Sequence, residues 1–129
     1  MSAVPFTSID KLYIAGRWQT ADAREAVLNP ATEAVIGNAP LGETAATRAA
    51  IDAARDAFDE GSWPGLKMAE RAEILSRMHA VLVAKRDLIA QLIVAEVGCA
   101  QGITHAMQVG APLDHFKSAI EHSARDDRS

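Results

Sequence analysis

The chain has 129 residues, of which 49% are hydrophobic and 23% are charged, and its formal net charge is −4. This composition is typical of one soluble globular domain, and it lacks both the basic footprint of a nucleic-acid groove and the roughly 18–20 apolar residues of a membrane span. A single cysteine excludes an internal disulfide, and the start of the chain shows no export signal, so we expect a cytoplasmic protein without nucleic-acid or membrane partners.

Short β-hairpins are predicted for residues 1–41. The stretch "LYIAGRW" at 12–18 places apolar and aromatic residues on both sides of Ala15-Gly16, where a glycine tolerates the positive φ of a tight turn. A second strand at 26–28 ends at Asn29-Pro30, because proline has no N–H to donate. The turn "NPATE" then leads into a third strand, "AVIGNAP", which ends at Pro40.

From Gly42 the apolar spacing changes to three and four residues, which predicts a helical region over 42–124. Its first helix starts at a cap provided by Thr44 or Glu43 and stops before Gly61. One stripe of that helix consists of Thr47, Ala50, Ile51, Ala54 and Phe58.

Three more helical stretches follow the break "SWPGL" at 62–66. The first runs roughly over 67–84, with Glu73 and Arg77 paired outward and with an inward stripe of Ile74, Leu75, Met78, Val81 and Leu82. The next begins after Arg86 and stops at Gly98, and it is expected to bury Leu88, Ile89, Leu92 and Ile93. The last spans about 103–123 and is interrupted or kinked near Gly110-Ala111-Pro112.

Cys99, the single cysteine, precedes His105 by six residues and raises the question of a catalytic thiol with its base. A nucleophilic cysteine needs a helix N-terminus or a cationic neighbour that lowers its pKa. Cys99 instead follows the predicted C-terminal end of a helix, where the dipole is negative, and Glu96 nearby has the wrong sign. We therefore expect no catalytic residue in this chain.

The remaining polar residues match no known site pattern. No second histidine or cysteine lies three or four residues from any of the four histidines (His79, His105, His115 and His122), so no metal site is predicted. Asp126 and Asp127 belong to a polar tail. Neither a glycine-rich phosphate loop nor a GxSxG motif occurs, so no cofactor-binding residue is predicted either.

Five short motifs, in order, resemble the N-terminal portion of an NAD(P)-dependent aldehyde dehydrogenase. They are an "I-x-G-x-W" hairpin, an "NPAT" turn, an "A-x-x-AF…W" helix, an "R-x-x-x-L" helix and a helix ending in "E-x-G". In this chain they comprise Ile14, Gly16 and Trp18; Asn29 to Thr32; Ala57, Phe58 and Trp63; Arg71 and Leu75; and Glu96 with Gly98. The resemblance covers about residues 12–117.

The resemblance implies an α/β fold, the aldehyde dehydrogenase fold. This chain alone would be mostly α, with short N-terminal β-hairpins followed by three to four helices. Residues 1–129 would form a single partial domain, the N-terminal part of the dinucleotide-binding domain. The family's catalytic cysteine, general-base glutamate and dinucleotide turn belong to later sequence, so the NAD or NADP of the full-length enzyme is not expected to bind this chain alone.

The resemblance also places the helix after "E-x-G" in the substrate-entrance wall, with Met107 and Ala111 as its candidate residues, four apart on one helix face. Simple helix packing is the other reading of this spacing. The full-length enzyme would oxidise an aldehyde to an acid, and a homo-oligomer or association through exposed apolar helix faces is expected.

One departure from the family pattern follows "DHFK". The chain reads "SAIEHSARDDRS" where the family continues with an aromatic, amphipathic helix. This suggests a truncated, frame-disrupted or deliberately short product. The alternative hypothesis is a stand-alone, non-catalytic helical module that binds a partner through apolar helix faces.

Overall fold

The computed structural model describes residues 11–125. The chain divides into two compact units, Met1–Pro64 and Gly65–Ser129. The boundary that we predicted between the hairpins and the helices lies inside the first unit, because the first helix contacts the first strand. The single domain over 1–129 stays a prediction, and Asp126 and Asp127 lie outside the described residues.

The first hairpin pairs β1 (Lys11–Ile14) with β2 (Arg17–Thr20) in antiparallel register. Its turn residues, Ala15 and Gly16, have φ angles of 51° and 76°, so both adopt the left-handed conformation that a two-residue hairpin turn requires. The predicted turn is confirmed. Tyr13 lies opposite Trp18, and the ring centroids are 5.0 Å apart.

The second hairpin pairs β3 (Ala23–Leu28) with β4 (Val35–Leu41). The Asn29 side chain shapes the turn, because its Oδ1 accepts the backbone N–H groups of Ala31 at 2.9 Å and Thr32 at 3.2 Å. Strand β3 is longer than predicted, and β4 has the predicted length but is shifted by one residue, so that Pro40 lies within β4 instead of ending it. Proline is tolerated there because each strand of a two-stranded sheet has a free edge.

Helix α1 (Thr44–Asp59) starts and stops where the sequence predicts. Glu43 occupies the N-cap position, although its side chain makes no capping hydrogen bond, and the Thr47 hydroxyl donates instead to the Gly42 carbonyl at 3.3 Å. A Cβ at Gly61 would lie 2.1 Å from the Ala57 carbonyl oxygen, so only glycine fits after this helix.

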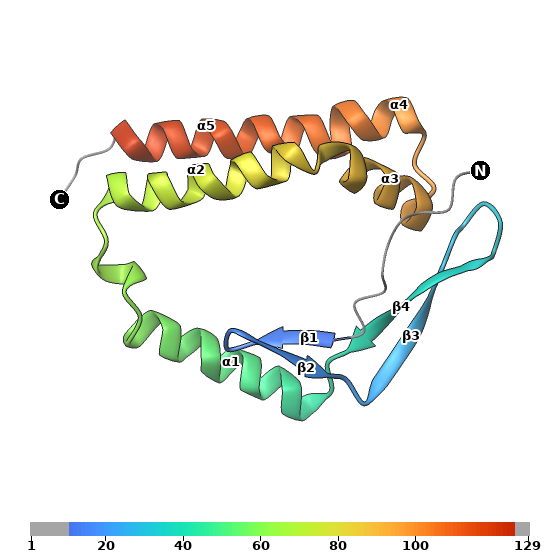
Figure 1. Cartoon of the computed structure of the whole chain (residues 1–129), viewed down its shortest axis with the longest axis horizontal. Coiled ribbons are helices and arrows are strands. Elements are labelled where there is room, and N and C mark those ends of the chain that lie inside the picture. The colour runs from blue at the N-terminus through green and yellow to red at the C-terminus, as the bar shows by residue number, and fades with distance from the viewer. Residues whose placement is uncertain (1–10, 126–129) are drawn as a thin grey trace. The chain divides into compact units, whose positions relative to one another are not determined.

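The second unit is helical. After the short turn η1 (Trp63–Gly65) it contains α2 (Met68–Ala84), α3 (Arg86–Val97), α4 (Gln101–Ile103), the π-helix η2 (Thr104–Gly110) and α5 (Ala111–Arg125). Glu70 begins α2 by accepting the Lys67 N–H at 2.8 Å. Helices α2 and α5 run side by side in opposite directions, and η2 packs on α3 (Figure 1).

Small side chains dominate the buried positions of the second unit. The buried residues there are Ala72, Ala90, Ala95, Thr104, Val109 and Ile120. The predicted inward stripe of α2 is wrong for Met78, Val81 and Leu82, which are exposed. Helix α5 is the main neighbour of α2 and leaves these three side chains uncovered, while Ile74 and Leu75 of the same stripe are half-buried. The predicted burial of Leu88 on α3 is also wrong, because that side chain is exposed.

The predicted architecture is confirmed for the described residues, with short hairpins first and helices after them. The ion pair between Glu73 and Arg77 is also present, at 3.6 Å on the surface of α2. None of the helices in the described part of the chain is both long and apolar enough to cross a membrane.

Candidate functional site

The segment around Cys99 begins where α3 ends. Gly98 adopts a left-handed conformation (φ 71°) and donates its N–H to the Val94 carbonyl at 3.1 Å. Cys99 is therefore half-buried just past the carbonyl end of α3, as the sequence predicts.

His105 lies on η2 and faces α3 rather than the thiol. Its Nδ1 is 3.8 Å from Oδ1 of Asp87, in the first turn of α3. Within residues 11–125 no hydrogen bond joins His105 to Cys99, which leaves the arrangement without a thiol–imidazole pair. The Asp87–His105 contact ties η2 to α3 weakly, because the carboxylate is mostly exposed.

The helical stretch over 101–125 widens into a π-helix immediately before Pro112. At its end the Ala111 N–H bonds to the Ala106 carbonyl, five residues back. Pro112 has no N–H, and its ring would collide with the carbonyl four residues earlier in a regular α-helix, so the wider turn relieves both problems. The predicted interruption near Gly110-Ala111-Pro112 is thus a π-helix.

Thr104 is the first residue of this π-helix and holds it in place. Its side chain is fully buried, and its hydroxyl donates to the Ala100 carbonyl at 3.1 Å. On the outer side Met107 is 63% exposed, whereas Ala111 is half-buried at the start of α5. The structure therefore offers one exposed, flexible apolar side chain on a locally irregular helix. The role of Met107 and Ala111 in a substrate-entrance wall stays a prediction.

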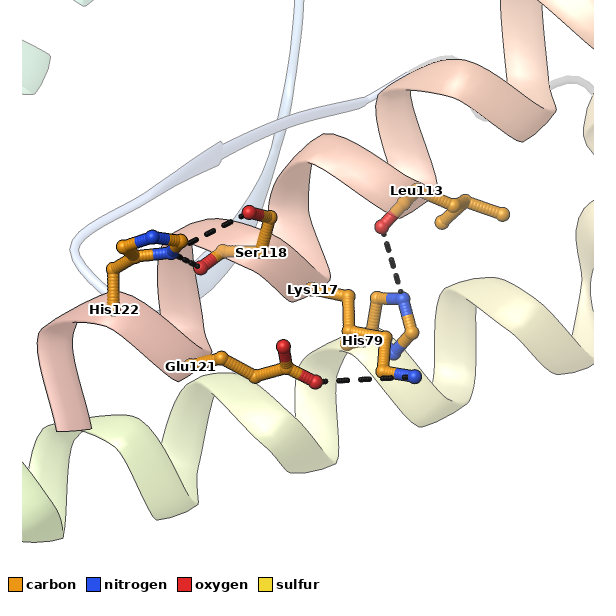
Figure 2. A network of polar contacts seen from close by, with 6 residues as sticks. All are labelled: His79, Leu113, Lys117, Ser118, Glu121 and His122. Carbon is orange, nitrogen blue, oxygen red and sulfur yellow. Dashed lines mark hydrogen bonds and ion pairs between the residues drawn. The ribbon is translucent and has the colours of Figure 1, made fainter. Parts of the chain in front are cut away.

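A polar contact that the sequence did not indicate connects α2 with α5. His79 Nε2 lies 3.1 Å from the Leu113 carbonyl oxygen, and the His79 ring meets Phe116 edge-on, with the centroids 5.9 Å apart (Figure 2). Because a carbonyl only accepts, Nε2 carries the hydrogen. A lone histidine on an apolar face gives no sequence signal for such a partner.

The other polar contacts in Figure 2 lie within α5 itself. His122 Nδ1 is 2.7 Å from the Ser118 carbonyl oxygen, and Lys117 pairs with Glu121 at 3.9 Å. Across residues 11–125, no three side chains of His, Cys, Asp or Glu gather at one place that could hold a metal ion. These contacts stabilise the helix and do not form a reaction site.

A protein-family model matches most of this chain. Residues 18–129 match the profile described as "Aldehyde dehydrogenase family". This chain belongs to the aldehyde dehydrogenase family. Among curated aldehyde dehydrogenases, the non-phosphorylating aspartate-semialdehyde dehydrogenase of Halomonas elongata is 40% identical over 114 residues, which are 87% of this chain and 20% of that protein.

Two solved aldehyde dehydrogenases have the same fold over the matched part. A mutant of aldehyde dehydrogenase C from Pseudomonas syringae, in complex with NAD+ and octanal, superposes with a TM-score of 0.84 at 34% identity, covering 91% of this chain and 24% of that one. Lactaldehyde dehydrogenase from Escherichia coli gives 0.80 at 37% identity, covering 89% and 24%. The chain thus spans about a fifth to a quarter of the length of these relatives.

Proposed function

We propose that this chain forms the N-terminal part of the dinucleotide-binding domain of an NAD(P)-dependent aldehyde dehydrogenase and acts there as scaffold. The observation that supports this most is the family match over residues 18–129, together with the TM-score of 0.84 to an enzyme crystallised with NAD+ and octanal. The whole enzyme would oxidise an aldehyde through a cysteine thiohemiacetal, hydride transfer to NAD(P)+ and thioester hydrolysis.

The described residues do not fit the dinucleotide itself. A pyrophosphate needs a helix N-terminus with free N–H groups and no opposing charge. Among residues 11–125, one turn leads from a strand directly into a helix, the turn between β4 and α1, and Glu43 occupies its N-cap. Because that carboxylate would repel a pyrophosphate, we assign cofactor binding to the part of the fold outside this chain.

A direct test is the production of NADH or NADPH by the purified 129-residue chain with short and long aldehydes, followed at 340 nm. We expect no aldehyde-dependent rate above that of the Cys99→Ala variant, because no histidine is paired with Cys99 among residues 11–125 and the chain spans only 24% of the P. syringae enzyme. E. coli lactaldehyde dehydrogenase serves as the positive control. Turnover that the Cys99→Ala substitution abolishes would contradict the proposal.

Met107 and Ala111 are proposed to line the substrate entrance of the complete enzyme. The exposure of Met107 on a π-helix supports this, since such irregular turns are frequent at functional sites and a thioether adapts its shape to apolar ligands. The half-buried Ala111 would provide the wall behind it.

The wall can be tested in a chimera that carries residues 18–129 in place of the matched segment of the P. syringae enzyme. Met107→Trp should raise KM for octanal about tenfold while kcat changes less than about twofold, because a bulky ring would obstruct binding and not the reacting groups. Met78→Trp, at another exposed methionine, is the matched control. Equal effects of the two substitutions on KM would refute the assignment.

We further propose that the complete enzyme is cytoplasmic and that it assembles into a homo-oligomer. The location is proposed because the single cysteine of the chain cannot form an internal disulfide, which is compatible with a reducing compartment. Association is supported by the large apolar side chains on the surface of the helices.

A further inference from the structure

The last residue of η2 is a glycine on which the closure of the π-turn depends. A Cβ built at Gly110 would lie 2.9 Å from the carbonyl oxygen of His105, five residues back. The obstructing atom belongs to the backbone, so it cannot move aside as the end of a flexible side chain can. Glycine allows such a close approach between backbone segments because it has no Cβ. The observed π-turn therefore requires glycine at position 110.

Gly102, in the same helical stretch, meets no such obstruction. A Cβ added there would have nothing within 4 Å among residues 11–125. Gly102 is also exposed, whereas Gly110 is half-buried. Alanine at 102 and alanine at 110 thus form a matched pair of substitutions, in which only one position is sterically closed.

Two buried residues of η2 are held in place, and the exposed Met107 lies between them. Thr104 is fully buried, and its hydroxyl donates to the Ala100 carbonyl at 3.1 Å. Val109, near the other end of η2, is buried as well. Because both ends of the π-helix are packed, the place of Met107 between them depends on how the turn closes at Gly110.

We propose that Gly110 is a positioning residue for the substrate entrance. Its missing side chain lets η2 close against the His105 carbonyl, and this closure sets where Met107 and Ala111 lie. The thioether of Met107 and the methyl group of Ala111 are both apolar, so the surface that they form suits the apolar tail of an aldehyde. The inference rests on the proposed function, and it adds the substrate class, aldehydes with a long apolar tail, and the residue that positions the wall.

The first part of the experiment measures the π-turn itself in the 129-residue chain. Amide hydrogen exchange is followed by NMR at Ala111, whose N–H bonds to the Ala106 carbonyl, and at Ile89 in α3 as the reference. Gly110→Ala should accelerate exchange at Ala111 at least about tenfold and at Ile89 less than about twofold, because the strain is local. Gly102→Ala should change both rates less than about twofold.

The second part measures aldehyde oxidation by the chimera with the P. syringae enzyme. Gly110→Ala should raise KM for octanal at least about fivefold and change kcat less than about twofold, because the wall contacts the tail and not the reacting carbonyl. KM for propanal, which has a short tail, should change less than about twofold, and Gly102→Ala should leave all these constants within about twofold. A substitution that only destabilised the fold would lower the amount of active enzyme, which reduces the apparent kcat for both aldehydes equally at unchanged KM.

Thr104 provides a second pair of variants, in case the chimera with Gly110→Ala does not fold. Thr104→Val removes the hydroxyl that donates to the Ala100 carbonyl and keeps the shape of the side chain, while Thr104→Ser keeps the hydroxyl. Thr104→Val should raise KM for octanal at least about threefold, and Thr104→Ser should leave it within about twofold of the unsubstituted chimera. This pair tests the same positioning from the other end of η2.

Three outcomes would overturn the inference. Equal acceleration of exchange at Ala111 and Ile89 would mean that Gly110 matters only for general stability. An unchanged KM for octanal with Gly110→Ala, in a chimera whose Met107→Trp variant does raise it, would mean that the wall does not depend on the π-turn, while the proposed function would stand. An unsubstituted chimera that oxidises no aldehyde would contradict the proposed function and the inference with it.

Discussion

Two glycines in the segment over 95–112 have opposite roles at the level of the single residue. Gly98 ends α3 with a φ of 71°, which an L side chain adopts only with strain. Gly102 lies in the helical turn α4, and a Cβ added to it meets nothing within 4 Å. Substituting alanine at each of these two positions therefore tests whether the backbone conformation of Gly98 determines how the chain continues past Cys99.

Gly98→Ala should lower the free energy of unfolding by about 1–2 kcal/mol, because alanine pays the steric cost of the left-handed conformation. Gly102→Ala should raise it by about 0.4–1 kcal/mol, because alanine restricts the unfolded chain without straining the folded one. Equilibrium urea denaturation followed by far-UV circular dichroism measures both changes. Shifts of the same sign at the two positions would show that φ at Gly98 is not the controlling factor.

Among the secondary-structure elements, the α2–α5 pair has a specific polar contact between its two helices. His79 reaches from one helix to a carbonyl of the other, while Ala72 and Ile120 supply the buried apolar surface. His122 makes a bond of similar length that remains within α5 and is exposed. A comparison of the two histidines therefore distinguishes a hydrogen bond between two helices from a hydrogen bond within one helix.

His79→Leu should lower the free energy of unfolding by about 1–2 kcal/mol, since it removes both the bond to Leu113 and the edge-on contact with Phe116. His122→Leu should change it by less than about 0.5 kcal/mol, because it replaces an exposed contact within one helix. Thermal melts at 222 nm compare the two variants. If His122→Leu were the more damaging substitution, the His79 contact would not be what stabilises the pair.

At the scale of the whole molecule, the sequence predicts element boundaries far better than burial. Gly16, Gly61 and Gly98 end their elements by local sterics, so their effect can be read without knowing the neighbours. Burial depends on which element lies opposite, and the sequence did not show that Met78 and Val81 would be left uncovered. The same limit applies to the predicted stripe of α1, in which Ile51 and Phe58 are exposed.

Part of the candidate site could be predicted from the sequence. The position of Cys99 at the end of a helix follows from Gly98 alone, and the structure confirms it. Pro112 predicted an irregularity, but whether a helix kinks or widens depends on the packing around Thr104 and Val109, which are both buried.

The core of each unit is small for its chain length. Ile14 and Ala21 are the buried apolar residues of the first unit within the described residues, and alanines make up most of those in the second. Because the hydrophobic free energy follows buried apolar area, each unit has little stability of its own.

The π-helix η2 affects how many residues the helical stretch over 101–125 can contain. Its hydrogen bonds reach one residue further than those of an α-helix, so it accommodates an additional residue within one turn. In a uniform α-helix that residue would rotate everything after it by about 100°, and Phe116 and Ile120 would turn away from their partners. Since the widening absorbs the rotation, this turn is a place where a residue can be gained or lost without altering how the following helix is seated.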